Sequence, residues 1–347
     1  MSITIHYSVP TIALVSMQRI RAVGLLSGGL DSILAVKLML DQGVEVVALN
    51  FKSPLWGDRR GRCKAAEVAA KLGIPLHVIE LGDDHLRMIR KPKYGYGSGM
   101  NPCIDCKIFM FKKAKSFAKK IGAKFLFTGE VLGERPMSQH RKALELIEKD
   151  AGLEDKILRP LSAKLLTPTE AELKGWVDRE KLLAIKGRSR KPQIALAKNM
   201  GIFDYPPPAG GCLLTEKEFA ARLRDLFNHR HRVHMRDIAL LKVGRHFRLG
   251  ENKIIVGRDE VENKTLLGFD DGRLTYLEVP DCGSPVTVLQ GRPMKKALIA
   301  AARLTARYSD AKGEKALVNY RRGAVSGKLA VERMLPEEIS TLRISET

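Results

Sequence analysis

The sequence predicts an α/β protein with a doubly wound parallel sheet, followed by a second, smaller α+β domain. In the first half of the chain, nearly continuous apolar runs alternate with stretches of helical spacing, and a glycine-rich turn joins the first run to the first such stretch. In the last third, short β-rich runs alternate with turn residues. Strands that are apolar on both faces are typical of parallel sheets covered by helices. A chain of 347 residues is long enough to form both cores.

The first half predicts a β-α-β-α-β order. Its apolar runs are expected to be strands, at residues 22–26, 44–51 and 75–81. The stretches 33–40 and 63–72 between them have helical spacing. A basic amphipathic helix is expected at 108–121, before a strand at 124–127 that ends in Thr128-Gly129-Glu130. Ligands of such folds bind at the carboxyl ends of the strands, so a nucleotide site is expected there.

The second half opens with less regular segments. Residues 157–166 are predicted to be irregular, and the basic segment GRSRK at 187–191 is predicted to be a loop. The run YPPPAGG at 205–211 is a stiff proline segment that delivers Cys212. A helix is expected at 219–227, before the basic segment HRHRVHMR at 229–236.

Beyond that basic segment we expect an α+β module. Its features are β-like runs at 238–243, 253–256, 274–279 and 286–289, a helix at 294–307 and a β pair around Val318 and Leu329. The predicted division of the chain is an extension at 1–19, a nucleotide domain at 20–165, an extension carrying Cys212 at 166–228 and the α+β domain at 229–347.

The charge of the chain predicts a polyanionic partner. Lys and Arg number 60 against 39 Asp and Glu, which gives a formal charge of +21. Nucleic acid is the leading candidate, because each phosphate that Lys or Arg neutralises releases counterions. No apolar run approaches the length of a membrane span. Five cysteines without a secretion signal argue against a disulfide framework, so a cytoplasmic location is expected.

The strongest motif is the segment Ser27-Gly28-Gly29-Leu30-Asp31-Ser32, between a predicted strand and a predicted helix. Two glycines allow a tight turn, and the helix that follows directs unpaired N–H groups and its positive dipole end at an anion. The segment lacks the Gly-Lys-Ser/Thr of a Walker A loop and the G-x-G-x-x-G spacing of dinucleotide binders. It therefore predicts a different kind of pyrophosphate site.

A second motif places two thiols one helical turn apart, in Asn101-Pro102-Cys103-Ile104-Asp105-Cys106-Lys107. A thiol at a helix N-terminus beside lysines is expected to have its thiolate favoured. Cys212, which follows the proline segment, is a third candidate. Cys63 and Cys282 stand alone and are expected to be structural.

Three hypotheses account for this set of cysteines. In the first, Cys103, Cys106 and Cys212 bind three irons of a 4Fe–4S cluster and leave the fourth iron open for a sulfide. In the second, Cys106 and Cys212 are a catalytic pair, in which one carries a persulfide and the other resolves it through a disulfide. In the third, the three thiols and a histidine such as His140 bind a structural zinc.

Together, SGGLDS, NPC-x-x-C-K, TGE and PAGGC resemble the motifs of tRNA thiouridine synthases, over roughly Ile20 to Phe227. SGG-x-DS resembles the PP-loop of ATP pyrophosphatases, whose fold is of the adenine nucleotide alpha hydrolase type. The resemblance is closest to the 2-thiouridylase branch, with kinship to 4-thiouridine synthases. It implies that ATP adenylates a uridine carbonyl oxygen and that sulfur then displaces AMP. It leaves open whether the uridine is at position 8 or 34, and whether the product is 4-thio- or 2-thiouridine.

The resemblance also implies site residues. Ser27, Gly28, Gly29, Asp31 and Ser32 would hold the pyrophosphate of ATP and Mg²⁺. Asn50 and Phe51 would border adenine, with Thr128 and Gly129 nearby. Cys103, Cys106 and Cys212 would be the reactive thiols or cluster ligands, and Asp105 is the candidate acid or base. Many 2-thiouridylases have aspartate at the position of Cys103, so the thiol here favours the cluster version of the family.

Residues 237–334 resemble the RNA-binding domain of NFACT proteins, which implies tRNA as the partner. Arg245, Arg248, Arg258, Arg321 and Arg322 are the candidate phosphate contacts. The sulfur donor, sulfide or a persulfide carrier, stays open, and so does homodimer formation. Two rival functions are a PP-loop C–N ligase acting on tRNA and a non-catalytic RNA-binding iron–sulfur protein.

Overall fold

The computed structural model describes residues 20–56, 64–207, 212–270 and 272–345. Its contacts divide the chain into two units, each discontinuous in sequence. The first comprises Met1–Asn50, Cys63–His77 and Phe111–Tyr205, and the second comprises Phe51–Arg62, Val78–Met110 and Pro206–Thr347. The predicted extension at 1–19, the lone Cys63 and residues 208–211 of the proline segment lie outside the described residues. The linear domain boundaries given above stay predictions.

A five-stranded sheet of the order β3-β2-β1-β4-β5 organises the N-terminal part of the chain. β1 (Arg21–Leu25) pairs in parallel with β2 (Glu45–Lys52) and with β4 (Phe125–Thr128), and β4 pairs in parallel with β5 (Ile157–Leu158). The strand before α3 is β3 (Leu76–Glu80). This confirms the predicted doubly wound parallel sheet, whose first strand lies in the middle.

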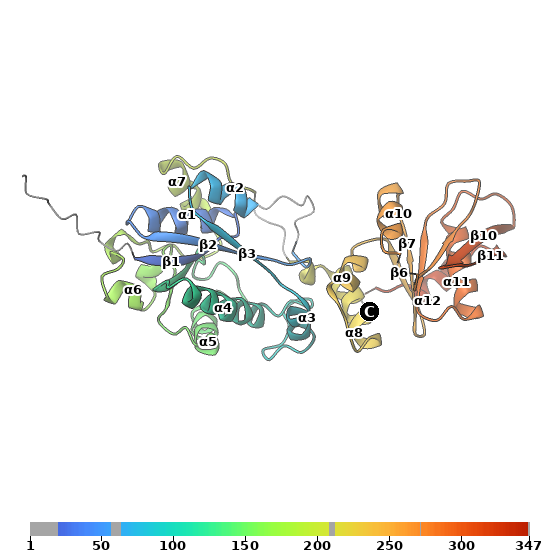
Figure 1. Cartoon of the computed structure of the whole chain (residues 1–347), viewed down its shortest axis with the longest axis horizontal. Helices are drawn as coiled ribbons and strands as arrows, with labels where there is room; N and C mark the ends of the chain where they lie inside the picture. The colour runs from blue at the N-terminus through green and yellow to red at the C-terminus, as the bar shows by residue number, and fades with distance from the viewer. Residues whose placement is uncertain (1–19, 57–63, 208–211, 271, 346–347) are drawn as a thin grey trace, which may run out of the picture. The chain divides into compact units, whose positions relative to one another are not determined.

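Helices cover both faces of this sheet. In Figure 1, α1 (Leu30–Leu40), α2 (Lys64–Lys71) and α7 (Lys191–Asn199) lie on one face, and α4 (Cys103–Lys120) and α5 (Arg141–Ala151) lie on the other. α1 is apolar nearly all round, because it packs against the strands on one side and α7 on the other. Ala22, Leu30 and Leu34 are fully buried in the resulting core.

Three elements of the chain differ from the sequence predictions. Residues 157–158 form the short fifth strand within the segment predicted to be irregular. The predicted basic loop ends in a helix, since α7 begins at Lys191 and has Pro192 in its first turn, where a missing N–H costs nothing. The apolar run at 238–243 was predicted to be β-like, but α9 (Met235–Leu241) occupies it, starting with a capping box between His234 and Asp237.

The second unit contains helices and a separate antiparallel sheet. α3 (Asp83–Arg90), α8 (Lys217–His229) and α9 pack their apolar faces with Leu55, Met100 and Leu214. Arg90 ties α3 to the end of α8, because its guanidinium donates hydrogen bonds to the carbonyls of Phe227, Arg230 and His231. α8 and the segment carrying Cys103 therefore belong to one packed body.

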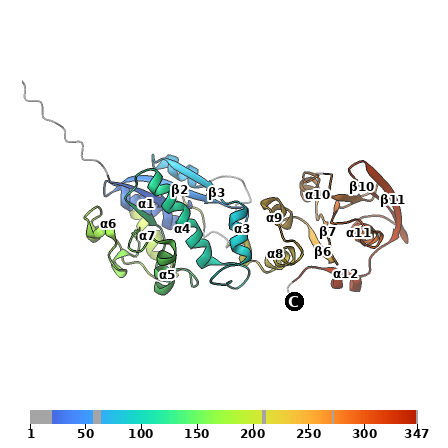
Figure 2. The same cartoon turned by 60° about the horizontal axis from the view of Figure 1, so that its bottom comes forward.

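The antiparallel sheet has six strands in the order β11-β10-β8-β9-β7-β6. The strands are β6 (Arg245–Leu249), β7 (Asn252–Val256), β8 (Thr275–Glu278), β9 (Thr287–Gln290), β10 (Lys315–Arg322) and β11 (Val325–Glu332). α11 (Lys295–Arg307) packs across one face of this sheet, as Figure 2 shows, and α10 (Glu260–Leu267) and α12 (Pro336–Leu342) complete the module. Val318 pairs with Leu329, which confirms the predicted closing β pair.

A buried charge cluster anchors α8 to the β6–β7 hairpin. The Asp225 carboxylate accepts hydrogen bonds from Arg248 Nε at 2.8 Å and Nη2 at 2.6 Å, and the Lys253 ammonium lies 3.3 Å away. The Lys253 side chain is only 3% exposed. The two cations are cross-strand neighbours, so one carboxylate serves both.

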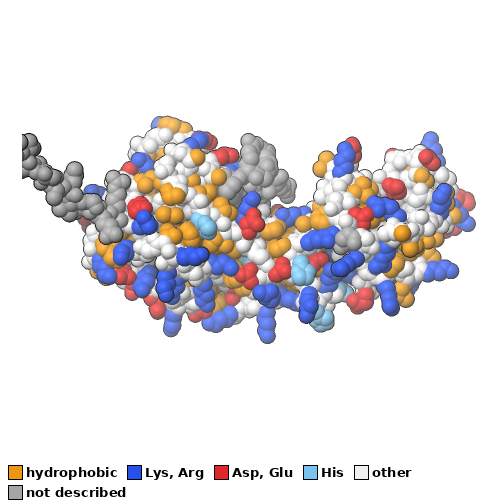
Figure 3. All heavy atoms as spheres, viewed as in Figure 1, with side chains coloured by type: hydrophobic (Ala, Val, Ile, Leu, Met, Phe, Trp, Pro, Cys, Tyr) orange, Lys and Arg blue, Asp and Glu red, His pale blue; other side chains and the backbone are white. Residues whose placement is uncertain are grey.

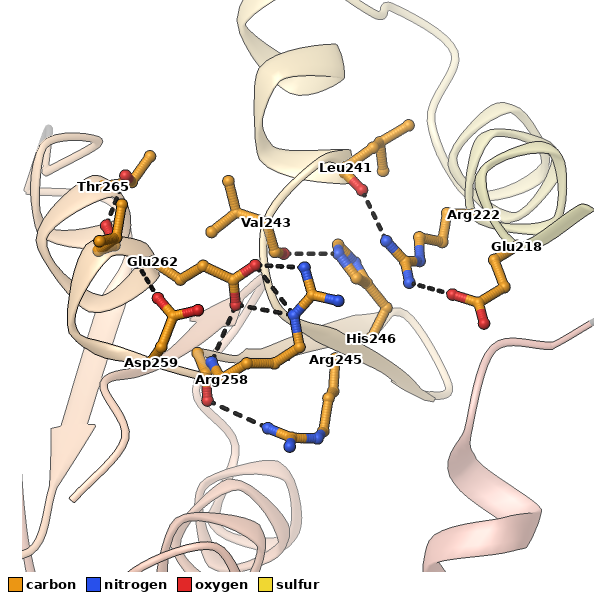
Figure 4. A network of polar contacts seen from close by, with 12 residues as sticks. Glu218, Arg222, Leu241, Val243, Arg245, His246, Arg258, Asp259, Glu262 and Thr265 are labelled. Carbon is orange, nitrogen blue, oxygen red and sulfur yellow. Dashed lines mark hydrogen bonds and ion pairs between the residues drawn. The ribbon is translucent and has the colours of Figure 1, made fainter. Parts of the chain in front are cut away.

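A neighbouring polar network continues this junction (Figure 4). The Arg222 guanidinium donates to the Leu241 carbonyl at 3.1 Å and to Glu218 at 3.0 Å, which links α8 to α9. His246 is buried and donates from Nε2 to the Val243 carbonyl at 2.8 Å. Burial lowers the pKa of His246 well below its usual value, and the charges of Lys253 and Arg222 add to this effect. The ring is therefore neutral at pH 7.

Lys253 predicts a measurable pH dependence of stability. Burial lowers its pKa from 10.5 to about 8, although the charge of Asp225 opposes the shift. Between these values the unfolded chain binds more protons than the folded one, so this residue makes the free energy of unfolding rise with pH, by about 3 kcal/mol in total. Denaturant unfolding at pH 8 and pH 10 should show this rise in the wild type and a smaller one in Lys253→Met. Equal rises in both proteins would contradict the assignment.

Basic side chains gather over α4 and α5 (Figure 3). Exposed lysines and arginines on these two helices are Lys112, Lys115, Lys119, Lys120, Arg141, Lys142 and Lys149.

Three of the arginines predicted to contact phosphates form ion pairs within the α+β module and its neighbouring helix: Arg248 with Asp225, Arg258 with Glu262 and Arg321 with Asp270. Among the described residues, no helix is long and apolar enough to span a bilayer.

Candidate active site

The loop between β1 and α1 has the conformation of an anion cradle. Gly28 has a φ of +80°, which a side chain would disfavour, and Gly29 stands in the N-cap position of α1 without a side-chain cap. The Ser32 hydroxyl donates to the Gly29 carbonyl at 2.8 Å and lies 3.2 Å from the Ser27 hydroxyl. First-turn N–H groups and two hydroxyls therefore surround the helix N-terminus, as a pyrophosphate requires.

Two close backbone approaches shape this loop. A methyl group on Gly28 would lie 2.9 Å from the backbone of Ala65 and Lys64, so α2 packs directly on the loop. A methyl group on Gly129 would lie 2.5 Å from the carbonyl group of Asp31. The end of β4 thus touches the phosphate loop with no side chain between them. Glycine is required at both positions.

The other predicted nucleotide residues lie at the ends of β2 and β4. Asn50 donates from its amide nitrogen to the Leu26 carbonyl at 2.8 Å, which holds the ends of β1 and β2 together. Thr128 is buried, and its hydroxyl donates to Glu130 at 3.2 Å. Phe51 is buried as well. Their contact with adenine stays a prediction.

The structure brings a segment to the phosphate loop that the sequence analysis missed. The carboxyl group of Asp31 is mostly buried, and burial raises its pKa, while the charges of Arg190 and Arg135 and the Gln193 amide oppose the shift. Gln193 is fully buried on α7, yet within the described residues neither amide atom has a hydrogen bond of good geometry, and the same holds for Asp31 Oδ1. In the sequence, this helix is indicated only by the segment SRKPQ, in which the proline stands at a position that favours the start of a helix.

We expect Gln193→Leu to stabilise the free protein and weaken its binding of ATP. A buried amide without partners costs about 1–3 kcal/mol, which a leucine of similar size avoids. If the amide serves the nucleotide, its loss should raise the KM for ATP by about tenfold. Denaturant unfolding and pyrophosphate-release kinetics measure the two effects. Ile194→Leu on the exposed side of the same helix is the matched control, and unchanged KM in Gln193→Leu would show that the amide has no role toward ATP.

The three cysteines of the two thiol motifs lie together in the second unit. They lie close enough to affect one another's titration: besides burial, which is the largest cause, Cys212 and Cys103 raise the pKa of Cys106, and Cys103 raises that of Cys212. All three are free and partly buried. Cys103 opens α4, Cys106 lies one turn later, and Cys212 stands at the N-cap of the 3₁₀ turn Leu213–Thr215. Cys282 is elsewhere, packed against the core of the antiparallel sheet.

Backbone pairing explains how Cys212 reaches the other two thiols. Leu213 N–H donates to the Leu55 carbonyl at 3.0 Å, and Met100 N–H donates to the Leu214 carbonyl at 2.8 Å. Gly99 makes this approach possible, since a methyl group there would lie 2.3 Å from the Leu214 oxygen. The chain after the proline segment is therefore fixed against the loop that precedes Cys103.

Each sulfur atom has a polar neighbour. Asn101 donates from its amide nitrogen to Cys103 Sγ at 3.2 Å, and His85 Nε2 lies 3.4 Å from Cys106 Sγ. The Cys212 thiol donates to the Leu55 carbonyl at 3.5 Å. No motif in the sequence marks His85.

The expectation of a favoured thiolate at the start of α4 is wrong for Cys106. Burial raises the pKa of this thiol, and the charges of Cys212 and Cys103 add to the effect. Burial likewise raises the pKa of Cys212 to about 11. The cost of burying a negative charge therefore exceeds the stabilisation from the helix N-terminus and Lys107. The chain by itself keeps both thiols protonated at pH 7.

The Asp105 side chain fixes the loop that precedes α4. Its carboxylate accepts the N–H of Lys93 at 2.7 Å and that of Tyr94 at 3.1 Å, and the side chain is buried. Its role as an acid or base stays a prediction, which this geometry does not favour. His140, the candidate fourth zinc ligand, caps α5 and accepts the Ala143 N–H at its Nδ1.

The chemistry of the three thiols suits an iron–sulfur cluster and a zinc ion alike. Within the described part of the chain, no group of three or more His, Cys, Asp or Glu side chains is arranged to hold a metal ion. Ligands of one zinc ion all lie within about 2.3 Å of it. The cysteines of a 4Fe–4S cluster bind different irons and therefore stand further apart, and thiolates are the ligands that such clusters take.

Two family models match this chain. Residues 18–164 match "Thiamine biosynthesis protein (ThiI)", and residues 244–343 match "NFACT protein RNA binding domain". The first match contains the phosphate loop, Cys103 and Cys106 and the end of β4. The second contains all six strands of the antiparallel sheet together with α11 and α12.

Curated relatives match part of the chain. A "tRNA-specific 2-thiouridylase MnmA" of Syntrophotalea carbinolica is 37% identical over 115 residues, which are 30% of this chain and 32% of the relative. A "Probable tRNA sulfurtransferase" of Thermoanaerobacter sp. is 36% identical over 121 residues, 33% of this chain and 30% of the relative. A second MnmA, of Xanthobacter autotrophicus, is 29% identical over 217 residues, 58% of this chain and 52% of the relative. The chain thus spans between about a third and about half of these relatives.

Two solved structures are similar at low identity. A 4-thiouridine synthetase in complex with RNA and ATP has a TM-score of 0.38 and 22% identity, covering 56% of this chain and 45% of that one. The U34-tRNA thiolase NcsA of Methanococcus maripaludis with its 4Fe–4S cluster has a TM-score of 0.32 and 17% identity, covering 60% of this chain and 65% of that one. At these TM-scores, neither likeness supports an inference about this chain.

The two family matches agree with the two folds described above. The parallel sheet with its phosphate loop corresponds to the first match, and the antiparallel sheet to the second. Both resemblances stated from the sequence are confirmed. The chain joins a PP-loop domain similar to those of the tRNA thiouridine synthase group to a domain that matches the model of the NFACT RNA-binding domain.

Proposed function

We propose that this protein is an ATP-dependent tRNA thiolation enzyme. One observation carries the proposal: backbone hydrogen bonds of Leu213 and Met100 bring Cys212 to the loop that precedes Cys103, far from it in sequence, in a chain that also has a PP-loop. A nucleotide loop activates an oxygen, and a group of thiols handles sulfur. The names of the curated relatives support the same reaction class.

The PP-loop residues would carry the adenylation step. In this step the uridine carbonyl oxygen bonds to the α-phosphorus of ATP, and pyrophosphate leaves with its electron pair. Ser27, Ser32 and the N–H groups at the start of α1 would bind the pyrophosphate oxygens, where the helix dipole stabilises the charge that develops. Asp31 would hold Mg²⁺, which suits its unpartnered Oδ1. The oxygen then leaves as AMP when sulfur attacks the same carbon.

The three thiols would serve the sulfur step. In the version that we favour, Cys103, Cys106 and Cys212 hold a 4Fe–4S cluster, which supplies an open iron for a sulfide when it is bound. The chain's own contribution is to hold the thiols together through the Leu55 and Leu214 pairings, in an environment where each cysteine is partly shielded from water. In the alternative version, Cys106 and Cys212 act as a persulfide pair without a cluster.

Transfer RNA would be the macromolecular substrate. The charge of +21, the exposed lysines of α4 and α5 and the NFACT-type domain support binding through phosphates. A uridine in folded tRNA must leave its stack to reach an active site, which costs a few kcal/mol that backbone contacts offset. The position of the uridine, the sulfur donor, homodimer formation and the cytoplasmic location stay predictions.

Nucleoside analysis tests the proposal against its rivals. We expect tRNA from cells that lack this protein to miss one thionucleoside by mass spectrometry, and the anaerobically purified protein to contain iron and sulfide. Iron without a missing thionucleoside would favour a non-catalytic RNA-binding iron–sulfur protein. ATP-dependent formation of a different modified nucleoside, unaffected by Cys103→Ser and Cys212→Ser, would favour the C–N ligase.

A further inference from the structure

His85 is a buried histidine beside the thiol group. It lies in the first turn of α3, its side chain is fully buried, and its ring nitrogen Nε2 is 3.4 Å from Cys106 Sγ. Burying a histidine ring costs free energy unless polar partners compensate. The Cys106 sulfur atom, at hydrogen-bond distance from Nε2, is a polar partner that offsets part of this cost.

Aromatic side chains hold this ring in place. The Trp56 ring meets it edge-on at 6.2 Å between centroids, and the Phe109 ring lies at 5.4 Å in a tilted arrangement. Phe109 belongs to the same helix as Cys106, so α4 supplies both the sulfur and one wall around the ring. At the backbone, His85 N–H donates to Asp84 Oδ1 at 2.9 Å, which fixes the start of α3. These contacts leave the imidazole little freedom to turn.

The three sulfur atoms differ in what surrounds them. Cys103 accepts from the side-chain amide of Asn101, and Cys212 contacts a backbone carbonyl. Cys106 alone among the three is faced by an aromatic nitrogen held between other rings. Once Cys106 is a thiolate, only the ring N–H can be the donor in this contact.

We propose that His85 is a positioning residue for sulfur chemistry at Cys106, which donates a hydrogen bond from Nε2 to the Cys106 thiolate and so orients and stabilises it. The inference rests on the proposed function, because it needs Cys106 to be a ligand or nucleophile. Partners in the second sphere fix the orientation of metal ligands, and hydrogen bonds to cluster sulfurs help to set reduction potentials. A donor to a ligand sulfur stabilises the reduced, more negative cluster, so its loss lowers the potential.

The test compares His85→Phe and His85→Gln with the wild type. Phenylalanine fills the space without a donor, whereas glutamine places an amide N–H near the position of Nε2. The same His→Gln change at His77, an exposed residue stacked on Phe117, is the matched control. Each full-length protein is purified anaerobically, reconstituted with iron and sulfide, and reduced with dithionite in a one-electron step. Iron and sulfide content, the electron paramagnetic resonance spectrum and the reduction potential are then measured, with thermal unfolding as the test of folding.

We expect His85→Phe to have a lower potential and to lose iron faster, His85→Gln to return toward the wild type, and His77→Gln to match it. A potential and spectrum unchanged in His85→Phe at full iron content would overturn the inference. So would failure of folded His85→Gln to recover any of the change, since the ring would then act by shape alone. Absence of iron from the wild type would be a failure of the cluster version itself, and the two failures are therefore distinguishable.

Discussion

Replacing Cys212 by serine is expected to reduce formation of the thiolated nucleoside by at least about 1000-fold, because it removes one of three converging thiols that no other side chain replaces. Serine is nearly isosteric with cysteine, and Cys212 is only partly buried, so the fold should persist. ATP should still bind, since the PP-loop is untouched. The measurement is mass spectrometry of tRNA nucleosides after a reaction with ATP, Mg²⁺ and sulfide.

Three further variants are needed to interpret this result. Cys282→Ser is the matched control, because Cys282 packs against the core of the antiparallel sheet and is expected to have no role in the reaction. Cys106→Ser should be as inactive as Cys212→Ser, and the double variant should be no worse than either single one, as for groups that act as a unit. Retention of more than about a tenth of the activity in Cys212→Ser would remove Cys212 from the site.

Gly129→Ala is expected to lower kcat/KM for ATP-dependent pyrophosphate release by about 100-fold. The new methyl group would lie 2.5 Å from the Asp31 carbonyl, a contact with backbone that no side-chain rotation can relieve. The phosphate loop or the end of β4 must move, and a shift of about 1 Å in a group that positions substrate costs about 100-fold in rate. Pyrophosphate release in the presence of tRNA measures the effect.

Gly82→Ala serves as the control for this substitution. A methyl group on Gly82 would meet its nearest atom, Asp84 Oδ1, at an ordinary 3.6 Å, and the residue does not have a positive φ. The N-cap change should cost at most about 1 kcal/mol of stability. If Gly129→Ala and Gly82→Ala had equal kinetics, the close packing of β4 on the phosphate loop would have no part in ATP use.

The structural features that the sequence predicts correctly each depend on residues that are close together in the chain. A strand that is buried on both faces is a continuous apolar run, and the SGGLDS turn carries its own conformational demands in Gly28 and the N-cap Gly29. The pairing of Val318 with Leu329 follows from two β-rich runs joined by a short turn. In contrast, the apolar run at 238–243 is too short for its periodicity to distinguish a strand from a helix. The capping box at the start of α9 favours the helix that the structure shows.

The α/β class, the phosphate loop and the spacing of Cys103 and Cys106 can be deduced from the sequence alone, because each depends on neighbouring residues. Which distant groups meet depends on how the elements pack in three dimensions. His85 reaches Cys106 because α3 packs beside the start of α4, and Gln193 approaches Asp31 because α7 packs on α1. Burial, which sets the pKa of Cys106, is likewise a property of the folded chain. Contacts between distant segments arise from packing and desolvation, which no local pattern of residues encodes.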